Sequence, residues 1–181
     1  KAVYYQKHMA HHLLPEVGRD WLAGLRHAFL IRDPAEMLAS LARVLPEPRL
    51  EDTGLPQQVE LFERTAAGAG APPPVLDARD VLEDPEGLLR ALCAALGVPF
   101  DPAMLRWAPG PRPTDGVWGR HWYGTLWRST GFEPYRPKAE PMPDRLRPLL
   151  DACEPLYRRL YRHRLTPAAA APHDGPRTTD P

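Results

Sequence analysis

Short apolar runs alternate along the chain with longer segments whose apolar side chains repeat every three to four residues. The runs at residues 2–7, 27–31 and 74–78 are mostly apolar, with β-branched or aromatic side chains, as is typical of buried strands. The longer segments show the period of amphipathic helices. Strands that alternate with helices predict an α/β fold, with a parallel sheet covered by helices on both faces.

Two of the expected helices begin with the same capping sequence, an aspartate followed by a proline. Asp33 and Asp84 can each cap a helix whose first position is that proline, and Glu36 can reach back from the third position. The second of these helices is predicted over residues 86–96, and Gly97 ends it. Further helices are predicted over the remaining amphipathic segments, residues 16–25, 57–65 and 145–162, with a flexible run at residues 66–71.

Two stretches lack this periodicity. Residues 108–143 are rich in proline, glycine and aromatic side chains, and they predict an irregular segment. Residues 166–181 are rich in alanine and proline, and we expect them to form a disordered tail. The remaining residues, 1–165, are expected to form one domain.

Composition limits the classes of partner. Lys plus Arg and Asp plus Glu each number 23, so the formal net charge is zero and no nucleic-acid partner is predicted. No apolar run approaches the ~20 residues of a membrane span and no signal peptide is visible, so we expect no membrane partner and a cytoplasmic protein. Cys93 and Cys153 form no CxxC, and no metal is expected. The oligomeric state is left open.

The first candidate for chemistry is the segment FLIRDPAEMLAS, residues 29–40. Arg32 ends a predicted strand, and Ser40 follows eight positions later, about two turns into the next helix. The fork of donors on arginine suits phosphate, and the serine hydroxyl could close on the same anion if the helix packs back along the strand end. The alternative is that Arg32 is a surface charge and Ser40 a small packing residue.

The second candidate is the segment KHMAHHLLP, residues 7–15, just past the first predicted strand. Ligands of parallel sheets bind beyond the carboxyl ends of the strands. Lys7 could ease charge onto a leaving phosphate, and a histidine could take a proton from an attacking group. In the alternative, Met9 and the leucines pack, and the histidines are ordinary polar residues at a helix start.

Two further features are open to more than one interpretation. Asp77 and Asp80, near the end of the third predicted strand, could touch a ligand, although capping and turn roles are favoured. The aromatic, Gly-punctuated segment over residues 111–132 could form a lid over an adenine or an apolar acceptor, with Arg120 or Arg128, and also Arg112, near a phosphate. Alternatively, its aromatic side chains pin an irregular segment to the core.

Taken together, these segments resemble the sulfotransferase family over nearly all the ordered chain. That family holds the 3′-phosphate of 3′-phosphoadenosine 5′-phosphosulfate with a strand-ending arginine and a serine at this spacing, joined by Arg-(Asn/Asp)-Pro. The resemblance implies this role for Arg32 and Ser40. Residues 75–107 are similar to the late strand and helix of bacterial sulfotransferase-like proteins.

The resemblance also implies catalytic roles near the N-terminus. The cytosolic members carry Lys-Thr-His-Leu-Pro where this chain has the segment that begins at Lys7. The position two after Lys7 is Met9, so His11 or His12 would act as the base. Transfer would take a sulfuryl group to a hydroxyl or amine of a small-molecule acceptor, on a three-layer α/β/α fold of the P-loop NTPase-like type.

The sequence departs from the family at two places. No Arg-Lys-Gly element occurs in the late segment, which leaves Arg120 and Arg128 as candidates to grip the phosphate. No Gly-rich loop of the Pro-x-x-Gly-(Thr/Ser) kind precedes Lys7. We therefore expect a domain that lacks the first strand and phosphate loop and is inactive by itself.

Two other functions stay open at this point. One is a non-catalytic nucleotide-binding or interaction module on the same fold, and the other is a kinase-like phosphoryl transferase. In either case we expect at least three parallel strands, containing Tyr4, Leu30 and Val75, with Arg32 beyond a carboxyl end.

Overall fold

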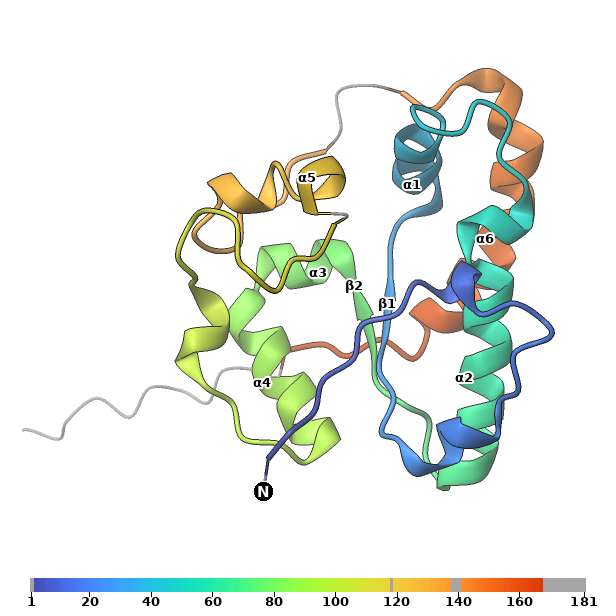
Figure 1. Ribbon diagram of the computed structural model, residues 1–181. Coiled ribbons are helices and arrows are strands. Elements are labelled where there is room, and N and C mark those ends of the chain that lie inside the picture. Colours follow the sequence, from blue (N-terminus) through green and yellow to red (C-terminus); the bar gives the residue numbers. More distant parts are fainter. Residues whose placement is uncertain (1, 118, 138–140, 168–181) are drawn as a thin grey trace, which may run out of the picture.

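Two short parallel strands lie at the centre of the part of the chain that the structure describes (Figure 1). The structure is a computed structural model, and it describes residues 2–117, 119–137 and 141–167. Strand β1 (Phe29–Ile31) pairs in parallel with β2 (Val75–Asp77), which confirms the predicted arrangement of these two segments. The N–H of Leu165 donates to the carbonyl of Val75 at 2.7 Å, so the chain after the last helix runs beside β2.

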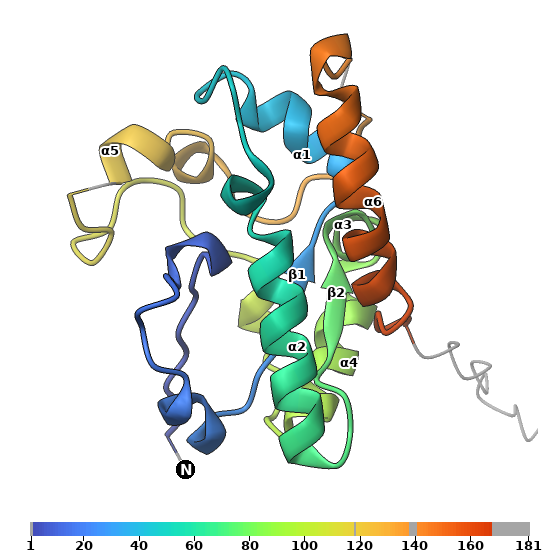
Figure 2. The same cartoon turned by 90° about the vertical axis from the view of Figure 1, so that its right-hand side faces the viewer.

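Helices cover both sides of this pair. Figures 1 and 2 agree that α2 and α6 lie on one side and that α3 and α4 lie on the other. The helices are α1 (Pro34–Leu41), α2 (Leu55–Ala69), α3 (Ala78–Glu83), α4 (Pro85–Leu96), α5 (Gly119–Trp122) and α6 (Arg147–Tyr161). Short 3₁₀ turns join them: η1 (Ala10–His12), η2 (Asp20–Gly24), η3 (Leu50–Thr53), η4 (Pro102–Leu105), η5 (Leu126–Arg128) and η6 (Asp144–Leu146).

The helix boundaries follow from local chemistry. The Asp33 side chain accepts from the N–H of Glu36 at 3.0 Å, and the Asp84 side chain accepts from the N–H of Gly87 at 2.9 Å, as predicted. Gly97 ends α4 with a φ of 61°, a conformation that glycine adopts without strain. Helix α2 runs on through the predicted flexible alanines to Ala69, because alanine favours helix.

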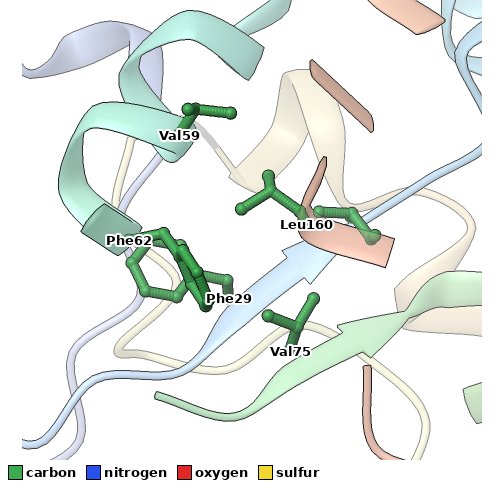
Figure 3. Packing of buried hydrophobic residues seen from close by; sticks show 6 residues of the cluster. Phe29, Val59, Phe62, Val75 and Leu160 are labelled. Carbon is green, nitrogen blue, oxygen red and sulfur yellow. The ribbon is translucent and has the colours of Figure 1, made fainter. Parts of the chain in front are cut away.

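Two groups of buried side chains join the layers. The first surrounds the strands, where Phe29 and Val75 pack against α2 and α6 (Figure 3); its fully or nearly buried members are Phe29, Ile31, Val59, Phe62, Val75 and Leu160. The second fixes α1 against α6, and its buried members are Leu38, Leu55, Leu146, Leu150 and Cys153. Helix α6 contributes to both groups, so it holds α1 in place beside the end of β1.

The prediction of a strand at residues 2–7 is wrong. Val3, Tyr4 and Tyr5 are 66%, 86% and 80% exposed, and the segment pairs with no strand among the described residues. Its β-favouring side chains cannot form a sheet without a partner strand to receive their backbone hydrogen bonds. The expected helix at residues 16–25 is likewise reduced to the turn η2.

The remaining expectations have different outcomes. Most of the tail expected at residues 166–181 lies outside the described residues. Within the described part, no helix is long and apolar enough to cross a membrane. The mixed α/β class is confirmed, whereas the three-layer P-loop arrangement stays a prediction.

Candidate functional site

Arg32 lies immediately beyond the carboxyl end of β1, where the sequence predicted it. Its side chain is 40% exposed, and both Nε and Nη2 donate to Oε2 of Glu36, at 3.3 and 3.0 Å. The carboxylate of Glu36 therefore occupies the guanidinium donors of Arg32. The sequence analysis assigned Glu36 only to helix capping, although its i,i+4 spacing from Arg32 is the signal for this ion pair.

Ser40 follows Glu36 by four residues on α1, so the two share one face of the helix. Ser40 is partly buried. The structure thus places Arg32, Glu36 and Ser40 in a row that starts at the end of β1. The joint binding of one anion by Arg32 and Ser40 stays a prediction.

A tyrosine from the late irregular segment meets this row. The hydroxyl of Tyr135 donates a short hydrogen bond to Oε1 of Glu36, and the guanidinium of Arg79 lies 4.9 Å from the centre of the Tyr135 ring. The bond to Glu36 raises the pKa of Tyr135, so the phenol remains a donor. Arg79 comes from the first turn of α3, just past β2, so groups from both strand ends and from the late segment converge here. The sequence analysis missed Tyr135, which no motif marks.

The end of β2 is held by a buried carboxylate. Asp77 is 3% exposed; its Oδ1 accepts from the N–H of Arg79 at 2.9 Å and its Oδ2 from the hydroxyl of Tyr157 at 2.8 Å. Burial raises the pKa of Asp77, and burial together with Asp77 raises the pKa of Tyr157. Asp80 pairs with Arg164 at 2.9 Å. The favoured capping role of Asp77 is therefore confirmed.

Two histidines near the N-terminal end, His11 and His12, lie in the turn η1, whereas His8 precedes it and contacts Gln6 at 3.0 Å. The rings of His11 and His12 meet edge to face at 4.4 Å between centroids, while Lys7 is exposed and donates to the sulfur of Met9 at 3.0 Å. His11 is partly buried and His12 is exposed. Burial lowers the pKa of His11, and the neighbouring His12 lowers it further, while Asp52 acts in the opposite direction. These effects together favour the neutral form of the His11 imidazole.

The turn η1 lies at the end of α2 that approaches β1. A methyl group built on Gly54, which caps α2 with a φ of 72°, would lie 3.4 Å from the backbone nitrogen of His11. One helical turn further, the side chain of Gln58 donates to the carbonyl of Leu30 at 3.2 Å. His11 is thus connected through the start of α2 to the strand that carries Arg32.

The structure places Arg120 and Arg128 elsewhere. Both are exposed on the segment around α5 and η5, which lies on the α3 side of the strands in Figure 1, and Arg120 donates to His121 at 3.1 Å. Their role in phosphate binding stays a prediction.

The aromatic side chains of this segment form contacts within it. The indole N–H of Trp107 donates to Ser129 at 3.0 Å, and that of Trp127 donates to Asp115 at 2.7 Å. The Trp107 ring also meets Phe132 edge to face. These bonds hold the segment together; whether it forms a lid or is pinned to the core stays a prediction. No group of His, Cys, Asp and Glu in the described part could hold a metal ion.

Comparison with known proteins gives a family match over nearly the whole chain. A family model described as sulfotransferase domain matches residues 1–164. Two curated proteins of Arabidopsis thaliana are similar over 163 residues: branched-chain-amino-acid aminotransferase-like protein 2, at 34% identity, and branched-chain-amino-acid aminotransferase-like protein 1, at 36%. Each match covers 90% of this chain but 29% of the relative, so the chain spans less than a third of their length. No solved structure matches significantly.

Proposed function

The chain belongs to the sulfotransferase domain family, and from this premise we propose that it serves sulfuryl transfer from 3′-phosphoadenosine 5′-phosphosulfate to a hydroxyl or amine of a small-molecule acceptor. The observation that carries the proposal is the position of Arg32 at the carboxyl end of β1, with its donor fork already closed on an anionic group. Parallel sheets bind their ligands at this edge.

In this proposal Arg32 and Ser40 hold the 3′-phosphate of the donor. The phosphate replaces the carboxylate of Glu36 on the Arg32 fork, because a phosphate offers more charge and more acceptor oxygens than a carboxylate. Tyr135 continues to donate to Glu36 and keeps that carboxylate in place after Arg32 leaves it. Arg120 and Arg128 are additional candidates for contacts to the donor.

The transfer itself forms a bond between the acceptor oxygen or nitrogen and sulfur, and breaks the bond between sulfur and the bridging phosphate oxygen. His11 takes the acceptor proton, since its lowered pKa keeps it neutral and its ring is fixed beside Gly54. Lys7 stabilises the negative charge that passes to the released adenosine 3′,5′-bisphosphate. His12 is the alternative base.

A transfer assay with the natural, full-length protein that carries this domain tests the proposal. The protein is incubated with sulfur-35-labelled donor and a panel of phenols, alcohols and amines, and labelled products are separated by chromatography. We expect labelled product that His11→Ala reduces by a hundredfold or more, with His8→Ala, an exposed neighbour, as the matched control. Bisphosphate binding without any transfer would instead indicate a binding module. Transfer of phosphorus-32 from ATP would indicate a kinase-like enzyme.

A further inference from the structure

A hollow is formed by the segment that runs from the end of α4 through η5. It is a cavity of about 480 Å³ lined by Ala103, Arg106, Trp107, Ala108, Gly110, Arg112, Asp115, Leu126 and Trp127. A smaller cavity of about 310 Å³ also has Arg112, Asp115 and Trp127 in its wall and adds Arg120. The two cavities share these three wall residues, and we call them together the indole hollow.

Backbone hydrogen bonds hold the walls of the indole hollow together. The N–H of Trp107 donates to the carbonyl of Thr130 at 3.1 Å, and the N–H of Gly110 donates to the carbonyl of Trp127 at 2.7 Å. Arg106 forms an antiparallel bridge with Gly131. These bonds tie the two sides of the hollow to each other.

The two tryptophans offer ring surface rather than hydrogen bonds. Both indole N–H groups already donate within the segment, to Ser129 and Asp115. A methyl group on Gly119 would lie 3.1 Å from Cζ2 of Trp127, so close packing fixes this ring from behind. With Leu126 and the alanines, the indole surfaces suit a flat apolar ring.

The charged side chains around the hollow favour an anionic ligand. Arg106 and Arg112 are exposed. Within the described residues neither guanidinium forms a hydrogen bond or an ion pair, although the pKa of Asp115 is lowered by its bond from the Arg112 backbone N–H and, to a smaller degree, by the charge of Arg112. The carboxylate in the wall, Asp115, already accepts from the N–H of Arg112 at 2.8 Å and from Trp127. Arg120 adds a third positive charge at the rim of the smaller cavity. Arginine forks bind carboxylates, sulfates and phosphates with paired, charge-assisted hydrogen bonds.

We infer that the indole hollow binds a small molecule that combines a planar aromatic ring with an anionic group. The ring lies against the indoles of Trp107 and Trp127, and the anion is held by Arg106 and Arg112. Neither Arg32 nor Ser40 lines the hollow, so the inference does not rest on the roles proposed for those two residues.

Binding of two nearly isosteric probes tests this inference. We compare 2-naphthoate with 2-naphthamide, which has the same ring system but no charge, by titration calorimetry on the whole chain. The expected result is about tenfold tighter binding of 2-naphthoate, the effect of about one charge-assisted hydrogen bond. Two-dimensional NMR should show shifts of the Trp107 and Trp127 indole N–H signals with both probes.

Substitutions of surface arginines test where the anionic group of the probe binds. The double variant Arg106→Gln/Arg112→Gln should remove the preference for 2-naphthoate and leave the affinity for 2-naphthamide unchanged. Arg147→Gln, which removes the same charge from an exposed position on α6, should keep the preference. Arg32→Ala should keep it as well.

Three results would overturn the inference: equal affinities of the native chain for the two probes, an unchanged preference in the double variant, or no binding of either probe. Loss of the preference in Arg32→Ala would also overturn it, because the anion would then lie at the end of β1. Failure of the proposed function leaves these outcomes unaffected, since no sulfuryl donor is present in the titrations.

Discussion

Replacing Arg32 with alanine should weaken the binding of adenosine 3′,5′-bisphosphate, the product of the proposed reaction, by about tenfold. The substitution removes the donor fork at the end of β1 and changes nothing in the core, since the side chain is 40% exposed. We expect the fold to survive, because the groups of buried side chains that join β1 and α1 to α6 do not include Arg32.

The expected tenfold loss of affinity follows because Arg32 exchanges Glu36 for the phosphate when the ligand binds. A hydrogen bond to a charged group contributes about 1.5–3 kcal/mol. In the free chain Arg32 already bonds to Glu36 at 3.0 Å, and a partly exposed pair of this kind is worth about 0–1 kcal/mol. The contribution of Arg32 to the free energy of binding is the difference between these two values, roughly 1–2 kcal/mol. Each 1.4 kcal/mol changes the affinity tenfold.

Titration calorimetry with the native chain and two further variants completes this test. Arg90→Ala is the matched control, because Nε and Nη2 of Arg90 also both donate to one carboxylate oxygen, that of Glu86 on α4. Arg90→Ala should leave the affinity unchanged. Glu36→Gln should raise it about twofold, since the competing ion pair is lost. Unchanged affinity in Arg32→Ala would remove Arg32 from the binding site and refute the exchange with Glu36.

Four other substitutions test the fold and the ionisation of His11. Tyr157→Phe removes the hydroxyl that donates to Oδ2 of the buried Asp77. The free energy of unfolding, measured by urea titration, should therefore fall by about 1–3 kcal/mol. No change would show that water replaces the phenol. Leu38→Ala, at a fully buried position, should lower the free energy of unfolding by about 2–5 kcal/mol. Leu30→Ala, at a 56% exposed position, should lower it far less. Equal losses would contradict the assignment of the core. His11 has a lowered pKa in the folded chain, so the unfolded chain binds more protons near and below pH 6.5. Stability should therefore decline as the pH falls through this range, and His11→Gln should flatten the decline; an identical slope in the variant would contradict the burial of His11.

The parts of the fold that the sequence predicted are those set by neighbouring residues. The caps at Asp33 and Asp84 act within a single helical turn, so their residues could be recognised without knowledge of the tertiary structure. The position of Arg32 followed from the same local pattern, a short apolar run that ends where a capped helix begins. Gly97 ended its helix as expected because its φ of 61° is a local requirement.

The parts that the sequence did not reveal depend on distant contacts. Tyr135 lies 99 residues from Glu36, and Tyr157 lies 80 residues from Asp77, so no spacing rule connects either pair. Residues 2–7 have the composition of a strand, but a strand forms only where another strand accepts its hydrogen bonds. The sequence of residues 2–7 therefore looks like a strand whether or not a partner strand is present.

The central claim is that Arg32 and Ser40 together hold the 3′-phosphate of a sulfuryl donor. The most direct test is a crystal structure of the chain with adenosine 3′,5′-bisphosphate bound. We expect 3′-phosphate oxygens at about 2.7–3.2 Å from the Arg32 guanidinium and the Ser40 hydroxyl, with Glu36 displaced from Arg32 and still bonded to Tyr135. A nucleotide bound with its 3′-phosphate away from the end of β1, and with the Arg32–Glu36 pair intact, would contradict it.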